Sequence, residues 1–327
     1  MKAYKYRANL LDAKTLKRRD TVSLLEYEFC ASQFKDLNDP FEGSFELKMV
    51  DSDKLKFYQE INPIDKGIYS LALPKQEETF PSNELMWAHY ADSHKGFCIE
   101  YELTEFEKIF TPDFDLRRRI NISYQADMPS ITNEDFSDVF CIQEKVFGTK
   151  SLAWNSENEI RLVFEKSGMK KYSNNAITGI YFGLNVGIDE RNYIFDTLKD
   201  KNICFYQMNR IVNSYKLSCS QLNISDIYNY QIIRQSGNHI VDNYNVLYCG
   251  INKDSVTMQN FVNEFRRGKS KPINITIFDN IEVDKCIDKR SYETTEIEHQ
   301  LLSKHWIAYS SFDAPESIWM YPERCYL

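Results

Sequence analysis

The sequence predicts an α+β protein built from two modules. The chain has 327 residues, and two domains fit this length better than one, because single domains usually contain about 100–200 residues. Hydrophobic residues make up 43% and charged residues 27%, which is ordinary usage for a globular protein with a packed core. Segments that alternate between apolar and polar residues, as strands do, are interspersed with segments of helical period.

The first module, residues 1–205, mixes short strands with helices. Asn38-Asp39-Pro40 predicts a turn, because Pro40 fixes its own φ and disfavours the helical region for Asp39. Ser82 or Asn83 can cap a helix that starts near residue 84, and Gly96 ends that pattern. We expect strands at residues 4–7, 21–25, 68–73, 97–101, 157–164 and 176–182, and further helices at residues 11–19 and 137–147.

The second module, residues 241–327, follows a polar segment rich in Asn, Tyr and Ser at residues 206–240, where we place the connection. Asp254 or Ser255 can cap a helix whose apolar residues recur at helical spacing. We find no catalytic constellation in this small α/β module. Its other predicted elements are strands at 245–251 and 273–277, a helix at 294–304 and a hairpin of residues 306–310 and 317–320.

Charge and composition exclude several classes of protein. The net charge of −8 does not support broad attraction to nucleic acid or to an anionic membrane. No apolar stretch approaches the roughly 18 residues that a membrane span needs, and the N-terminus lacks an apolar signal core. None of the eight cysteines forms a CxxC pair. We therefore expect a cytoplasmic protein with reduced thiols and no membrane partner.

His89 and His94 are the obvious candidates for a metal site, but their spacing argues against one. Five residues of helix turn the chain by about 500°, which leaves the two side chains about 140° apart. In a strand, an odd separation places them on opposite faces. We therefore expect no metal. One of the histidines is then a hydrogen-bonded structural residue, or one imidazole binds a polar ligand near the Gly96 turn.

Glu157, Glu159 and Arg161 share one face of the predicted strand at 157–164, with apolar residues on the other face. Two carboxylates at alternate positions lie about 6–7 Å apart. Such a row can hold ribose hydroxyls or stabilise a developing positive charge. The alternative is a solvated sheet face with a cross-strand ion pair. The chain contains no P-loop, GxGxxG, HExxH or GxSxG motif.

Several motifs, taken in order, resemble the bacterial domain-of-unknown-function family 2971. The resemblance covers about residues 2–200, and its most specific part is the long run around Trp87–Gly96. The segments that carry it are Tyr4–Arg7, Leu37–Glu42, Met86–Ile99, Lys150–Trp154 and Glu157–Arg161.

The layout of these motifs is similar to that of ADP-ribosyltransferases. Those enzymes place an Arg or His on a first strand, a Ser or Tyr on a second and an E-x-E on a later one. Arg7, Ser70 and Glu157-x-Glu159 follow in that order here. The resemblance implies a split mixed or antiparallel sheet with flanking helices, and NAD as a co-substrate. The sequence departs from the pattern because it lacks an S-T-S triplet on the second strand.

The same resemblance implies roles for individual residues. Glu159 would bind the nicotinamide-ribose hydroxyl and stabilise an oxocarbenium-like transition state. Glu157 would position the acceptor, Arg7 would bind the pyrophosphate of NAD, and Ser70 would support the scaffold. Tyr90, with His89 or His94, would contact the nicotinamide or the acceptor. The resemblance assigns no role to the segment from Asn38 to Glu42.

Three functions remain open from the sequence. The first is an ADP-ribosyltransferase or NAD glycohydrolase, acting as a toxin or phage-defence effector on an unidentified macromolecular acceptor. The second is a metal-dependent nuclease or phosphodiesterase built on His89, Asp92, His94 and Asp39. The third is a non-catalytic module that binds a ligand, with the C-terminal module binding a protein partner. Convergence of Arg7, Ser70 and Glu159 on one cleft would favour the first function.

Overall fold

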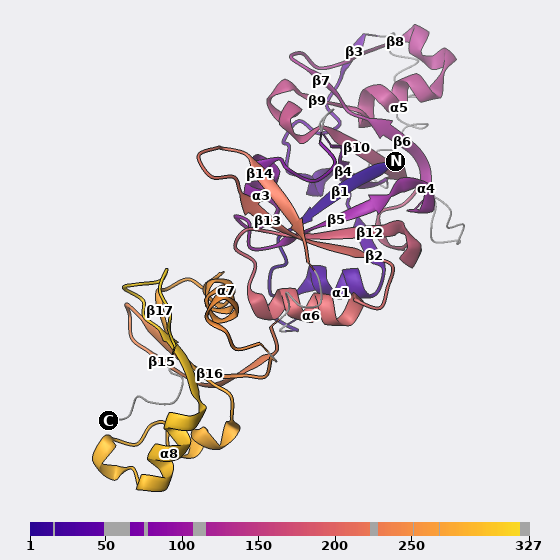
Figure 1. Cartoon of the computed structure of the whole chain (residues 1–327). Helices are drawn as coiled ribbons and strands as arrows, with labels where there is room; N and C mark the ends of the chain where they lie inside the picture. The colour runs from indigo at the N-terminus through magenta and orange to yellow at the C-terminus, as the bar shows by residue number, and fades with distance from the viewer. Residues whose placement is uncertain are drawn as a thin grey trace. The chain divides into compact units, whose positions relative to one another are not determined.

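The computed structural model describes residues 1–15, 17–48, 66–74, 78–106, 116–222, 228–250, 252–267 and 269–320. The chain divides into two compact units, which Figure 1 shows in one view. Unit 1 consists of Met1–Leu184 and Ile194–Gln221, and unit 2 consists of Asn185–Tyr193 and Leu222–Leu327.

The break between Gln221 and Leu222 falls inside residues 206–240, where the sequence predicts a connection. Strands occupy much of that segment, on both sides of the break. Their sequences are polar because many of their side chains are partly or fully exposed, as expected for strands that face solvent. Because of this polar composition, the strands in this part of the chain are difficult to predict from the sequence.

Unit 1 is built on one eight-stranded sheet, which confirms the mixed α+β fold. Strands β12 and β13 pair in parallel, and the other neighbours pair antiparallel. In sheet order the strands are β14 (Leu217–Gln221), β13 (Cys204–Arg210), β12 (Ile177–Phe182), β5 (Phe97–Glu102), β1 (Lys2–Arg7), β4 (Gly67–Ala72), β10 (Glu159–Phe164) and β6 (Leu116–Asn121).

The pairing between β1 and β4 differs from that of their other neighbours. Strand β1 pairs with β5 from Lys2 to Arg7, and β4 pairs with β10 along its whole length. Within the described residues, the register between β1 and β4 joins only Tyr4 to Ala72. The sheet therefore opens between these two central strands, and the side chains that follow Tyr4 on β1 lie beside this opening.

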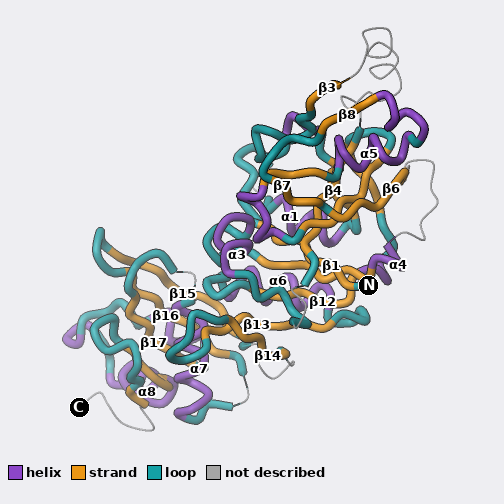
Figure 2. The backbone as a smooth tube through the Cα atoms, turned by 90° about the horizontal axis from the view of Figure 1, so that it is seen from above, coloured by secondary structure: helices purple, strands orange, loops and turns teal. Residues whose placement is uncertain are grey.

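Two helices pack against different strands of this sheet. Helix α3 (Glu84–Tyr90) contacts β1 through an edge-to-face contact between Trp87 and Tyr6, whose ring centroids are 5.2 Å apart. Helix α5 (Val139–Phe147) packs on β6 and β10 in a shared apolar cluster. In Figures 1 and 2, α5 lies at the β6 end of the sheet, away from β13 and β14. Unit 1 also contains helix α4 (Leu103–Phe106) and three two-stranded ladders. The ladders are β2 (Glu28–Ala31) with β11 (Gly168–Lys171), β3 (Glu46–Lys48) with β8 (Ser130–Thr132), and β7 (Ser123–Gln125) with β9 (Thr149–Ser151).

The predictions of a helix at 11–19 and a strand at 21–25 are wrong. The structure has a turn followed by helix α1, Arg19–Leu25. The turn forms because the carboxylate of Asp12 accepts hydrogen bonds from two following backbone N–H groups, at 2.9 and 2.8 Å. An Asp side chain that binds nearby backbone competes with helix formation. Leu24 then enters the core from a helix rather than from a strand.

Unit 2 is a small α/β unit, with five strands in the order β15-β16-β17-β18-β19. Strands β16 and β17 are parallel, and helix α7 joins them. Asp254 caps α7, and the four apolar residues at helical spacing are buried, as the sequence predicts. The bounds are β15 (Tyr230–Gly237), β16 (Asp242–Tyr248), α7 (Ser255–Arg266), β17 (Ile273–Phe278), α8 (Glu296–His305), β18 (Trp306–Ser310) and β19 (Trp319–Met320).

Helix α6 (Ile188–Leu198) contributes residues to both units. Its first part carries Ile188 and Arg191, which pack with and bind residues of unit 2. None of the helices in the described part of the chain combines the length and the apolar character that crossing a membrane requires.

Candidate functional site

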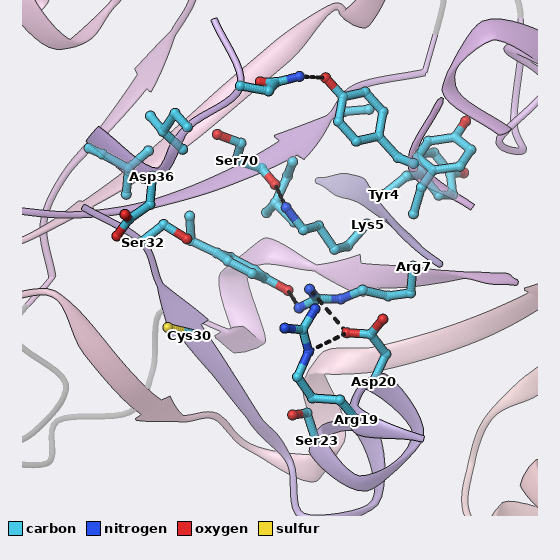
Figure 3. A pocket seen from close by; sticks show the side chains of 18 of the residues that line it. Tyr4, Lys5, Arg7, Arg19, Asp20, Ser23, Cys30, Ser32, Asp36 and Ser70 are labelled. Carbon is cyan, nitrogen blue, oxygen red and sulfur yellow. Dashed lines mark hydrogen bonds and ion pairs between the residues drawn. The ribbon is translucent and has the colours of Figure 1, made fainter. Parts of the chain in front are cut away.

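A cavity of about 810 Å³ lies where the sheet opens between β1 and β4. Lys5 and Arg7 of β1 line it from one side, and Ser70 of β4 lines it from the other. Figure 3 shows the side chain of Lys5 reaching towards Ser70, and Arg7 reaching towards Asp20. We call the part of the lining around Glu157 and Glu159 the acidic end, and the part around Lys5 and Arg7, which also contains the carboxylate of Asp20, the cationic end.

At the acidic end, the ammonium of Lys150 lies among three carboxylates. Its Nζ atom is 2.6 Å from Glu157, 3.2 Å from Glu159 and 3.5 Å from Glu42. All four side chains are at least nine-tenths buried. Because isolated buried charges are very costly, this arrangement is stable only as a connected set.

Arg161 completes this acidic cluster, which we define as Glu42, Lys150, Glu157, Glu159 and Arg161. The guanidinium is fully buried. Its Nε donates to Glu159 at 2.7 Å, its Nη2 donates to Glu42 at 2.5 Å, and its Nη1 donates to the carbonyl of Phe147 at 3.1 Å. The cluster thus contains three carboxyl groups and two basic groups beside the cavity.

The strand predicted at 157–164 begins two residues later than expected, at Glu159. Glu157 instead ends a short 3-10 helix, and Asn158 takes a left-handed conformation with φ 46° and ψ 55°. The Asn158 side chain donates to the carbonyls of Leu73 and Pro74, both at 3.2 Å, which fixes this turn. Glu157 therefore reaches the same cluster as Glu159 without sharing its strand.

The face that carries Glu159 and Arg161 is buried, which removes the alternative of a solvated sheet face. Burial alone would raise the pKa of Glu159, but the charges and hydrogen bonds of Arg161 and the charge of Lys150 lower that pKa to about 2. The neighbouring carboxylates likewise raise the pKa of Lys150, against the effect of its burial. Glu159 is therefore a fixed anion throughout the neutral pH range.

Tyr90 forms a wall of the cavity beside the acidic cluster. Its hydroxyl donates to Glu157 and accepts a hydrogen bond from the amide of Asn38. Burial and the Glu157 carboxylate raise the pKa of Tyr90, so the hydroxyl stays protonated. The segment from Asn38 to Glu42, which has no role from sequence, thus closes the acidic end, with Asn38 on Tyr90 and Glu42 on Arg161.

The cationic end of the cavity carries Lys5, Arg7 and Arg19. The ammonium of Lys5 donates to the carbonyl of Ser70 at 2.7 Å, across the opening in the sheet. The guanidinium of Arg7 donates to the hydroxyl of Tyr69 at 3.2 Å and lies 3.6 Å from the carboxylate of Asp20. Arg19 approaches the same carboxylate at 3.9 Å. Two guanidinium groups thus share the carboxylate of Asp20.

The histidines of the Trp87–Gly96 run lie elsewhere. Among the described residues, the lining of the cavity includes Tyr90 but neither His89 nor His94. His89 is exposed. The ring of His94 stacks on Trp87, with centroids 6.0 Å apart and planes 10° apart, and its burial lowers its pKa.

The same run forms a tight turn between α3 and β5. Asp92, Ser93 and His94 all have positive φ, at 45°, 53° and 69°. At Gly96 a β-carbon would lie 1.9 Å from the carbonyl oxygen of Arg7, so only glycine fits there. This turn therefore places α3, and with it Tyr90, against the strand that carries Arg7.

The geometry gives no support to a metal centre. The described residues contain no group of three or more His, Cys, Asp or Glu side chains that could hold a metal ion. Asp92 instead lies 3.8 Å from Lys95, and the carboxylate of Asp39 accepts a hydrogen bond from the backbone of Phe41. The residues named for a metal-dependent nuclease therefore do not meet within the described part of the chain.

Residues 86–162 match the family described as "Protein of unknown function (DUF2971)". This segment of the chain is similar to that family. The DUF2971 match is narrower than the resemblance at about residues 2–200, and it covers most of α3, the glycine turn and most of the acidic cluster. No curated protein and no solved structure matches the chain.

Of the site residues named from the sequence, the structure brings Arg7, Ser70, Tyr90, Glu157 and Glu159 to one cavity. Sequence reasoning missed the residues that hold them, chiefly Glu42, Lys150, Lys5 and Asp20. Glu42 and Lys150 lie in motifs that carry the family resemblance, which was the available signal. Lys5 could have been found because it lies two residues before Arg7, on the same face of β1.

Proposed function

We propose that this protein cleaves the bond between nicotinamide and ribose in NAD, and transfers ADP-ribose to an acceptor or to water. One observation carries the proposal. Arg7, Ser70, Glu157 and Glu159, which are far apart in sequence, line a single cavity at the opening between β1 and β4. Its volume of about 810 Å³ lies within the usual range of ligand pockets.

The acidic cluster suits the positive charge that develops on the ribose when nicotinamide leaves. Glu159 is held as an anion by Arg161 and Lys150, and its oxygen atoms are fixed by their hydrogen bonds. A preorganised negative group in a buried site stabilises an oxocarbenium-like transition state without reorganisation during the reaction. Glu157, held by Tyr90 and Lys150, then accepts a hydrogen bond from the attacking acceptor group.

The cationic end suits the diphosphate of the same molecule. Arg7 presents a planar guanidinium with five N–H donors, of which its contacts with Tyr69 and Asp20 engage only part. These contacts also hold the guanidinium in place before a ligand arrives. A bipolar cavity of this kind would bind a dinucleotide in one direction, with the nicotinamide ribose at the acidic cluster.

A second candidate function is nucleotide binding without turnover. The observation that favours it is the pairing of both Glu157 and Glu159 with Lys150, which reduces the charge they can offer to a transition state. The two functions share one ligand and one cavity, so they differ only in the release of nicotinamide.

The test is incubation with NAD and measurement of released nicotinamide, with protein and nucleic-acid acceptors included. Glu159→Gln keeps the size of the side chain and removes its charge, and should slow release by about 100-fold to 1,000-fold. Glu296→Gln, the same change at an exposed carboxylate of unit 2, is the matched control and should leave release unchanged. Binding of NAD without release by the wild type would instead support the second candidate.

A further inference from the structure

Lys5 is a charged side chain of the cavity to which the sequence assigns no role. It occupies the position on β1 two residues before Arg7, so both side chains leave the same face of the strand. The Nζ atom of Lys5 lies 4.9 Å from the centroid of the Tyr69 ring, and the guanidinium carbon of Arg7 lies 5.8 Å from it. Two cations therefore flank one aromatic ring.

The carboxylate of Asp20 beside this pair of cations also has other partners. Arg7 has the carboxylate of Asp20 at 3.6 Å, but Arg19 shares the same carboxylate. Asp20 also accepts a hydrogen bond from the backbone N–H of Asn9 at 2.9 Å. Lys5 has as its hydrogen-bond partner an uncharged carbonyl, that of Ser70. A dianionic ligand would neutralise both cations at once.

We propose that Lys5 and Arg7 together form a diphosphate-binding pair at the opening between β1 and β4. The proposal rests on the proposed function for the class of ligand, and adds the residue that recognises its central group. The sheet opening matters because it separates Ser70 from β1. A ligand oxygen can then replace the Ser70 carbonyl as the acceptor of the Lys5 hydrogen bond without breaking a strand ladder.

Binding of a diphosphate by this pair should be accompanied by proton uptake. Burial and the nearby charge of Arg7 lower the pKa of Lys5 to about 7, although acidic groups around it act in the opposite direction. The diphosphate would add negative charge beside the Lys5 ammonium and so would raise the pKa of Lys5. The groups that face Lys5 are Arg7 on its own strand, Tyr69 and Ser70 on β4, Asp20 on α1, and Glu157 and Glu159 at the acidic cluster.

ADP-ribose is a suitable probe, because its diphosphate is esterified at both ends and does not titrate near neutral pH. Calorimetric titration in two buffers of different ionisation enthalpy measures the protons taken up. For the wild type at about pH 8 we expect uptake of nearly one proton per ADP-ribose bound, since Lys5 is then mostly neutral in the free protein.

Variants of Lys5 test its role directly. Lys5→Met should bind ADP-ribose about 10-fold to 100-fold more weakly at about pH 6, and should show no proton uptake at pH 8. Lys5→Arg should keep most of the affinity but also lose the uptake, because arginine is always protonated. Lys14→Met, at an exposed lysine outside the cavity lining, is the matched control and should behave as the wild type.

Two outcomes would overturn the proposal: unchanged affinity and proton uptake in a folded Lys5→Met variant, or equal effects of the Lys5 and Lys14 substitutions. Binding of adenosine, which lacks phosphate, provides the check that each variant retains its cavity. Failure of the proposed function is distinguishable. A protein that binds ADP-ribose through Lys5 but releases no nicotinamide from NAD would refute turnover and keep the diphosphate pair.

Discussion

Arg161 in unit 1 is fully buried and Arg266 in unit 2 is partly buried, and the two arginines differ in their surroundings. Arg161 is bound by the carboxylates of Glu42 and Glu159, within a cluster of five charged groups. Arg266 is bound by the hydroxyl of Ser310 and by backbone carbonyls, at distances of 2.7–3.3 Å. Burial lowers the pKa of Arg266, whereas its carboxylate partners raise the pKa of Arg161.

The two arginines illustrate two roles of a charged side chain. Arg266 stabilises its own unit, whereas the charged cluster around Arg161 lies beside a cavity. The donors of Arg266 satisfy carbonyl groups near the end of a strand and a turn, so they stabilise unit 2 alone. The cluster around Arg161 holds more carboxylates than cations and lies beside the cavity. A set of hydrophobic residues would fill such a position at less cost, because buried ion pairs often contribute little net stability. This difference supports the proposal that the ligand site lies in unit 1.

The largest expected effect on stability comes from replacing either arginine with methionine. Arg161→Met should destabilise unit 1 by about 3–5 kcal/mol, because it leaves buried carboxylates without their partner. Arg266→Met, the same change in unit 2, should cost about 1–3 kcal/mol, because it leaves only uncharged acceptors unpaired. Hydrogen exchange measured on peptides from each unit in urea would give both values. Equal losses of stability in the two units would contradict the difference that we infer between the two arginines.

The next largest effect is a loss of stability of unit 1 at acidic pH. The folded-state pKa of Glu159, about 2, lies below its ordinary value of 4.5. Its contribution is therefore complete above pH 4.5, and is lost as the pH falls from 4.5 towards 2. The shift corresponds to about 3 kcal/mol in unit 1. Unfolding of the wild type and of Glu159→Gln, compared at about pH 6 and pH 3, measures this contribution. A wild-type loss no larger than that of the variant would contradict it.

A smaller effect should distinguish the residue that caps α3 from the residue that caps α7. Asn83 caps α3 in unit 1 and also donates to the carbonyl of Ser156, next to Glu157. Asp254 caps α7 in unit 2. Substitution of either by Ala should cost about 1 kcal/mol of stability. Asn83→Ala should in addition slow nicotinamide release about five-fold, because it loosens the segment that holds Glu157. Slower release in Asp254→Ala would show that the two units are not independent in function.

Much of the fold could be predicted from the sequence because its signals are local. The alternation in β10, the helical spacing in α7 and the Asn83 cap all have causes within a few residues of themselves. Helix α1 was predicted wrongly because a single side chain, that of Asp12, decides where the turn ends and the helix begins. Strand β14 was missed because its exposed face is polar.

The site could be predicted only in part, because its decisive contacts are long-range. The pattern of Glu157, Glu159 and Arg161 identified the acidic face, but not what binds it. Glu42 meets Arg161 across 119 residues of sequence, and no local pattern specifies that pairing. The opening between β1 and β4 is likewise a property of the sheet and not of either strand, so the cavity itself had no signal in the sequence.

The measurement that tests the central claim most directly is release of nicotinamide from NAD by the purified chain. We predict release by the wild type, a loss of about 100-fold to 1,000-fold in Glu159→Gln, and no change in Glu296→Gln. Absence of release by the wild type with acceptors present would contradict the claim. So would a Glu159→Gln variant that is folded and as active as the wild type.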